Sequence, residues 1–140
     1  MTDLGPANAY QASAVAINNF GQVIGVSFSN SDSAGELFFT DGRMTTLPVP
    51  ARVSAVSTFA INDNGEIVGS VFFASSAPVD AAKYGNGVWT DLGGIVGASS
   101  NKATEINISG QNVEPLSSPR HNTLPQSQES TCHFLRGRTA

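Results

Sequence analysis

Residues 61–69 read INDNGEIVG, and the same phrase stands at residues 17–25 as INNFGQVIG. It begins a third time at residues 106–113 as INISGQNV and breaks off there. The three copies begin 44 and 45 residues apart. A fixed period of this size is typical of repeat proteins, whose similar units stack on one another. The sequence therefore predicts a repeat architecture.

Each period has the residues of two β-hairpins. In the first unit, β-prone runs flank turns that contain Asn, Asp and Gly, the residues that most readily supply a positive φ. The second unit repeats this plan, and its Asn64-Gly65 pair is a strong hairpin signal. The predicted strands are residues 12–17, 22–28, 36–40 and 43–47 in the first unit, and residues 56–61, 66–73, 80–84 and 88–92 in the second.

Four short strands in one period are the content of a β-propeller blade, which buries its faces only against neighbouring blades. The Ile/Val pairs that precede Gly25 and Gly69 suit inner strands packed on both sides, and glycine there permits a close approach of the backbone. We therefore expect an all-β fold of about two and a half propeller-like, four-stranded units. A β-sandwich or a β-solenoid is the alternative, because the same strand spacing permits either.

The expected domain is residues 1–113, with units at about residues 6–47, 48–92 and 93–113, the last of them partial. Residues 2–5 match the end of a unit, so this segment could join the hairpin of residues 102–113. Otherwise the open faces would be covered by self-association into a homo-oligomer, or the chain would be a fragment of a longer array.

Residues 114–140 have a different composition, with three prolines, both histidines and the single cysteine. We expect a disordered tail there. The abrupt loss of the repeat after Val113 also fits a frameshift or a truncation, which would make this tail non-native. The two interpretations both stay open.

The composition of the chain argues against several kinds of partner and location. A net charge of −4, with only 13% charged residues, argues against nucleic-acid binding, which needs a concentrated Lys/Arg surface. One cysteine cannot form an internal disulfide. We expect no membrane span, because no apolar run has the necessary length, and no signal peptide is visible at the N-terminus.

The repeats resemble the HAF extracellular repeat, a tandem unit of bacterial proteins that are mostly predicted to be secreted. That unit has a Leu-Gly-Gly start, an Ile-Asn-Asp-x-Gly-Gln-Val-Val-Gly centre and a His-Ala-Phe-Leu-Trp strand. Here the start matches at residues 92–94 and the centre is clearest at residues 61–69, whereas the last strand appears only as residues 35–39 and 80–84. The resemblance covers residues 1–113 and implies a secreted or cell-surface location. It implies no catalytic residues.

No motif specifies a reaction, so we predict no catalytic, cofactor-binding or metal-binding residues. The loop of residues 62–66 carries oxygen ligands that calcium prefers, but its counterparts at residues 18–22 and 107–111 lack carboxylates. His121, Cys132 and His133 do not have zinc-site spacing, and no Gly-x-Ser-x-Gly elbow or dinucleotide fingerprint is present. The candidate residues are structural ones of the repeated turns, in which we expect the Asn side chains to bond the turn backbone: Asn18, Gly21, Gly25, Asn62, Gly65, Gly69, Asn107 and Gly110.

Aromatic residues are the one group that could contact a glycan or a peptide, because flat rings on a β surface suit such ligands. Core packing is the simpler role for most of them. They are Phe28, Phe38, Phe39, Phe59, Phe72, Phe73, Tyr84 and Trp89.

The function that these observations favour is a non-enzymatic β-repeat module that binds an unknown ligand, such as a protein or a glycan, or serves as a structural scaffold outside the cell. The alternatives are an accessory fragment of a larger secreted enzyme, and a truncated gene product without a function of its own.

Overall fold

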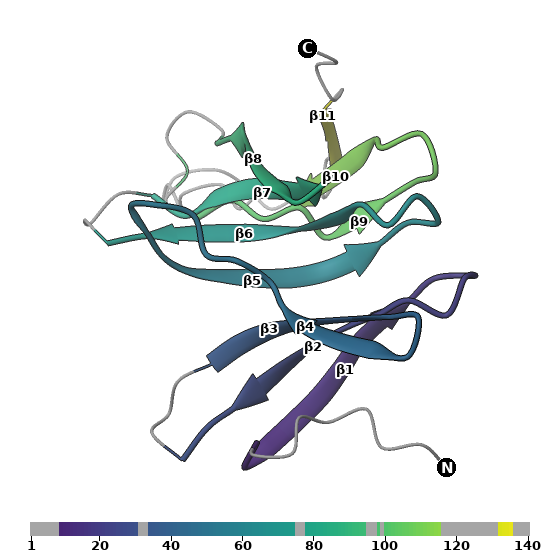
Figure 1. Cartoon of the computed structure of the whole chain (residues 1–140). Helices are drawn as coiled ribbons and strands as arrows, with labels where there is room; N and C mark the ends of the chain where they lie inside the picture. The colour runs from purple at the N-terminus through teal and green to yellow at the C-terminus, as the bar shows by residue number, and fades with distance from the viewer. Residues whose placement is uncertain are drawn as a thin grey trace, which may run out of the picture.

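The computed structural model describes residues 9–30, 34–74, 78–94, 98, 100–115 and 132–135, and of residues 34, 114–115 and 132–135 it describes the backbone alone. The described chain consists of β-strands and turns without helices, which confirms the all-β prediction. The strands form two four-stranded sheets and one three-stranded sheet, all antiparallel and open (Figure 1). Since this part of the chain has no helix, it also has none long and apolar enough to cross a membrane.

The first sheet contains the four strands of the first unit in chain order. They are β1 (Gln11–Ile17), β2 (Val23–Phe28), β3 (Ala34–Thr40) and β4 (Arg43–Thr46). The third strand starts two residues earlier than predicted, because Ala34 and Gly35 pair with Phe28 and Ser27. The polar composition of residues 29–35 predicts a loop over the whole stretch, so the start of this strand is corrected.

The second sheet repeats the first. Its strands are β5 (Val53–Ile61), β6 (Ile67–Phe73), β7 (Asp80–Gly85) and β8 (Val88–Gly93). Strand β5 begins three residues before the predicted start, since Val53 pairs with Phe73 at the far end of β6. Each four-stranded sheet thus accounts for one period of the sequence.

The third sheet is built from β9 (Glu105–Ile106), β10 (Asn112–Pro115) and β11 (Cys132–Leu135). Part of the tail expected to be disordered therefore pairs with β10, because a hairpin strand without a partner leaves its outer backbone groups free to bond. The predicted strand of residues 2–5, and the tail at residues 116–131 and 136–140, lie outside the described residues.

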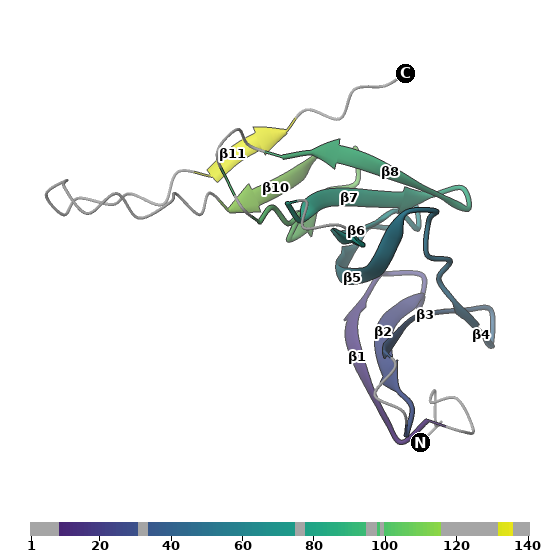
Figure 2. The same ribbon diagram turned by 90° about the vertical axis from the view of Figure 1, so that its left-hand side faces the viewer.

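The sheets meet mainly through the first strand of each unit. Strand β5 contacts β1, β2 and β3 (Figures 1 and 2). Strand β9 contacts β5 and β6 (Figure 1). Two apolar clusters fill these contacts. The cluster between the first and second units holds Ile24, Leu47, Ile67, Ala16, Phe38, Ile61, Tyr84 and Trp89, and the cluster between the second and third holds Ala60, Val68, Ala81, Ala103, Leu92 and Ile106.

Glycine is required where β6 passes the bulge of β5. An added Cβ at Gly69 would lie 1.8 Å from the carbonyl oxygen of Ser57, and one at Gly25 would lie 2.5 Å from that of Ser13. The pairing register shifts at both places, between Thr58 and Ala60 and between Ala14 and Ala16. Both glycines of the repeated phrase thus permit the close backbone approach that the sequence predicted.

The third unit departs from the repeat inside its core. Asn112 stands where the other units carry Val23 and Ile67, and its side chain is 0% exposed. Neither its Oδ1 nor its Nδ2 has a hydrogen-bond partner among the described residues. A buried amide without partners loses its hydration and regains nothing.

We predict that Asn112→Val raises the free energy of unfolding by about 1–2 kcal/mol, because it removes the desolvation cost and restores the β-branched residue of the repeat. Asn112→Asp should lower it, since a carboxylate would be buried without a partner. Urea denaturation followed by circular dichroism measures both. A loss of stability in the valine variant would show that the amide has a partner.

Candidate functional site: the asparagine ladder

The repeated turns share one geometry. The main-chain N–H of Gly21 donates to the carbonyl of Asn18 at 3.2 Å, and that of Gly65 donates to the carbonyl of Asn62 at 3.1 Å. The equivalent bond from Gly110 to Asn107 is 3.0 Å. All three glycines have a positive φ of 74° to 77°. This is a tight turn followed by a residue in the left-handed region, which glycine adopts without strain.

The asparagine that opens each turn also closes it with its side chain. Oδ1 of Asn62 accepts the N–H groups of Asn64 and Glu66 at 3.0 and 2.9 Å. The same pair of bonds is made by Asn18 to Phe20 and Gln22, and by Asn107 to Ser109 and Gln111. The asparagines thus satisfy the turn backbone, as expected from their turn chemistry.

The side-chain nitrogen of each asparagine has an acceptor four residues on. Nδ2 of Asn18 donates to Oε1 of Gln22 at 2.6 Å, Nδ2 of Asn62 donates to Oε2 of Glu66 at 2.7 Å, and Nδ2 of Asn107 donates to Oε1 of Gln111 at 2.8 Å. Glutamine and glutamate both supply a side-chain oxygen here, which explains why either can stand at this position of the repeat.

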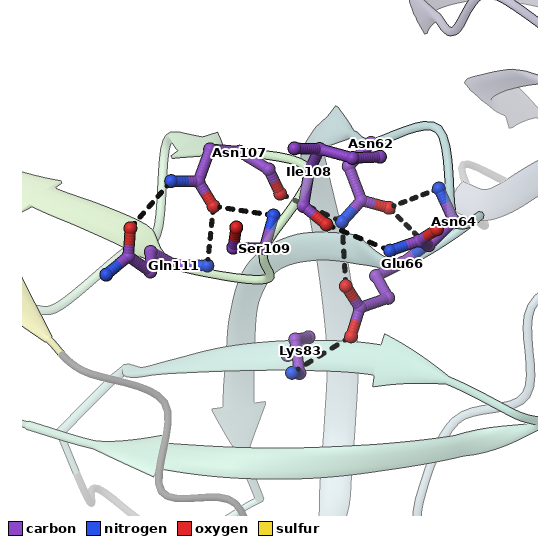
Figure 3. A network of polar contacts seen from close by, with 8 residues as sticks. All are labelled: Asn62, Asn64, Glu66, Lys83, Asn107, Ile108, Ser109 and Gln111. Carbon is purple, nitrogen blue, oxygen red and sulfur yellow. Dashed lines mark hydrogen bonds and ion pairs between the residues drawn. The ribbon is translucent and has the colours of Figure 1, made fainter.

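The same nitrogen joins one unit to the next. Nδ2 of Asn18 donates to the main-chain carbonyl of Asn62 at 3.0 Å. Nδ2 of Asn62 donates to that of Asn107 at 3.0 Å (Figure 3). These bonds span 44 and 45 residues, the period of the sequence. We call this series the asparagine ladder, and its rungs are Asn18, Asn62 and Asn107.

Further polar contacts run beside the ladder. The main-chain N–H and Nδ2 of Asn19 donate to the two carboxylate oxygens of Asp63 at 2.9 and 2.7 Å, and these bonds lower the pKa of Asp63. At the junction between the second and third units, Nδ2 of Asn64 donates to the carbonyl of Ile108 at 2.9 Å. The turns of neighbouring units are therefore joined at two positions each.

Glu66 is held by donors on two sides (Figure 3). Partial burial raises its pKa, but the bonds from Asn62 and Lys83 and the charge of Lys83 outweigh that effect, and the pKa is lowered. The Nζ of Lys83 lies 3.1 Å from Oε1 of Glu66. Asn19 donates hydrogen bonds to both carboxylate oxygens of Asp63, and Lys83 forms an ion pair with Glu66. These carboxylates therefore already have partners in the turns and between the units. This supports the turn interpretation of residues 62–66 over a calcium loop.

A buried polar pair joins β3 of the first sheet to β5 of the second. The hydroxyl of Thr58 donates to Oε2 of Glu36 at 2.6 Å, and both residues are buried. Burial raises the pKa of Glu36, while the bonds from Thr58 act in the opposite direction and do not offset it. The carboxyl group of Glu36 is therefore easier to protonate in the folded chain than in an exposed position.

The aromatic candidates divide between core and surface. Phe38, Tyr84 and Trp89 pack on the cluster between the first two units, and Phe73 packs on Val56, Val71 and Ala82 within the second. Trp89 also donates from Nε1 to the carbonyl of Pro48 at 2.8 Å. Phe28, Phe59 and Phe72 are exposed, and Nζ of Lys102 lies 5.8 Å from the ring centroid of Phe59.

The remaining candidates of the sequence, considered for a zinc site, fall outside what the structure describes. His121 lies outside the described residues, and so do the side chains of Cys132 and His133. Elsewhere in the described ranges, no group of three or more His, Cys, Asp or Glu side chains could hold a metal ion.

Three of the groups that build the ladder were not singled out by sequence reasoning. They are the side-chain acceptors Gln22, Glu66 and Gln111. The signal was present, because the three copies of the phrase keep Gln or Glu four residues after Asn. The pair of Thr58 and Glu36 has no such signal, since neither residue recurs at its equivalent position.

Comparisons of the chain with protein-family models, curated proteins and solved structures give no match. The resemblance to HAF repeats therefore stays a prediction from the sequence.

We predict that Asn18→Asp lowers the free energy of unfolding by about 1–3 kcal/mol, because it keeps both Oδ1 bonds of the turn but sets a carboxylate oxygen against the carbonyl of Asn62. Asn107→Asp is the matched control, since its Nδ2 reaches no further unit in the described chain. Urea titration followed by Trp89 fluorescence at sub-micromolar concentration measures both. Equal losses in the two variants would contradict a stabilising role of the junction bond.

We predict that Glu36→Gln removes a pH dependence of stability. Because the folded chain raises the pKa of Glu36 above its ordinary value of 4.5, the folded state binds more protons just above that pH, and the unfolding free energy falls as pH rises through this window. The variant should lack this fall and be at least as stable as the parent at pH 7.

Glu66→Gln is the control with the opposite sign. The pKa of Glu66 is lowered in the folded chain, so its contribution is present at neutral pH and is lost as pH falls through the lowered pKa. Unfolding midpoints between pH 3 and 7 compare the two variants. Parallel pH profiles for Glu36→Gln and the parent chain would contradict the assignment.

Proposed function

We propose that this chain is a non-enzymatic β-repeat module of an extracellular type, which acts as a structural scaffold or presents its repeated surface to a ligand. The observation that carries the proposal is the asparagine ladder. Its bonds join successive units at the period of the sequence, and the apolar clusters between the sheets follow the same order. The polar groups of the repeated phrase are thus used to fix units to one another.

The arrangement of the sheets supports a propeller-like form of this scaffold. Successive sheets meet through their first strands, as the innermost strands of neighbouring blades do. In proteins of this kind, stability comes from each unit and from its contacts with its neighbours. The HAF resemblance adds the expectation of a secreted or cell-surface location.

We predict that the chain, produced from its own gene in its native host, is found in the medium or on the cell surface. Antibody labelling of intact cells, with and without added protease, measures this. A cytosolic protein and an envelope protein of known position serve as controls. Detection only after lysis would contradict the extracellular part of the proposal.

A further inference from the structure

The asparagine ladder has a direction, so its two ends differ. Each bond between units runs from Nδ2 of one rung to the main-chain carbonyl of the following rung. In the described chain, Nδ2 of Asn107 has only the acceptor Gln111, and the carbonyl of Asn18 has only the donor Gly21. One end therefore offers an amide donor and the other offers the carbonyl that such a donor bonds.

The second sheet packs on the first unit through one of its faces, and the equivalent face of the first sheet points away from the second sheet. In the second sheet, Ile61, Ile67, Tyr84 and Trp89 stand opposite one another across the four strands and pack on the first unit. The equivalent row of the first sheet is Ile17, Val23, Phe39 and Met44.

Ile17, the first residue of this row, is exposed, whereas Val23, Phe39 and Met44 are partly buried. Ile17 is 67% exposed, whereas its counterpart Ile61 is partly buried in the cluster between the first two units. Val15 and Phe20, on β1 and in the turn after it, are exposed as well. The exposure of Ile17 leaves apolar surface uncovered at the position whose counterpart, Ile61, packs on a neighbouring unit.

We propose that a second copy of this chain covers this face, head to tail, with Nδ2 of Asn107 in the second copy donating to the carbonyl of Asn18. The inference rests on the proposed scaffold function and names its partner. The proposed junction would repeat the Asn Nδ2 to carbonyl bond that already joins the first unit to the second and the second unit to the third. Two copies joined at both junctions would bring the number of units into the range of about four to eight at which propellers close.

Among the described residues, Glu105 of the third unit differs in charge from its counterparts at this junction. Glu105 stands where the first and second units have Ala16 and Ala60, and its register with Val113 sets it on the face opposite to Ile106 and Asn112. In the head-to-tail arrangement this carboxylate meets the apolar row that begins at Ile17. Glu105→Ala should therefore tighten association by about tenfold or more.

The test is the solution mass of the full chain by light scattering over a range of concentrations. The expected result is a dimer that dissociates on dilution. Ile17→Lys should weaken association by at least about a hundredfold, whereas Val88→Lys, at an exposed position on β8, should leave it unchanged. Asn107→Asp should weaken association because it removes the donor, and circular dichroism checks that each variant is folded.

Mixing distinguishes this arrangement from a symmetric one. Ile17→Lys and Asn107→Asp chains should each be monomeric and should form a one-to-one complex together, because one intact junction remains. Ser109→Lys, in the exposed turn of the third unit, replaces Asn107→Asp if that variant does not fold. A parent chain that stays monomeric at about 100 μM, or a dimer that the third-unit variants do not affect, would overturn the inference. A folded monomer found on the cell surface would leave the proposed function standing.

Discussion

The structure depends on one side-chain amide that is fully hydrogen-bonded. In the middle rung, Oδ1 of Asn62 accepts two backbone N–H groups of its own turn, and Nδ2 donates to Glu66 and to the next unit. These four bonds use the whole capacity of an amide side chain. The two bonds within the turn fix the rotamer, and the fixed rotamer aims Nδ2 at the carbonyl one period away. Turn closure and the attachment of units are therefore a single interaction.

The glycine of each turn also takes part in the contact between units. An added Cβ at Gly110 would lie 3.1 Å from Oε2 of Glu66, and one at Gly65 would lie 3.3 Å from Oε1 of Gln22. The acceptor of one unit thus lies against the glycine of the next. Glycine serves twice here, because it supplies the positive φ of the turn and leaves space for the preceding unit's side chain. A side chain at this position would be strained and would also crowd the junction.

Sequence reasoning predicted the strands, the turns and the role of Asn within each turn, because these depend on residues that are near one another in the chain. It did not predict that the same Asn joins the units. The acceptor of that bond is a main-chain carbonyl, which every residue has, so no partner residue type marks it in the sequence. The period of 44 and 45 residues implied that units stack but not which atoms hold them.

The two junctions share the ladder but differ in what fills them. At the first, Glu36 and Thr58 form a buried polar pair. At the equivalent positions of the second, Ala81 and Ala103 belong to one apolar cluster. If Glu36 and Ala81 exchanged places, Thr58 would face an alanine and Ala103 would face a glutamate. Each of these combinations would leave a polar group buried without its partner. The ladder therefore joins the three described units in the same way, whereas the buried pair beside it differs from one junction to the next.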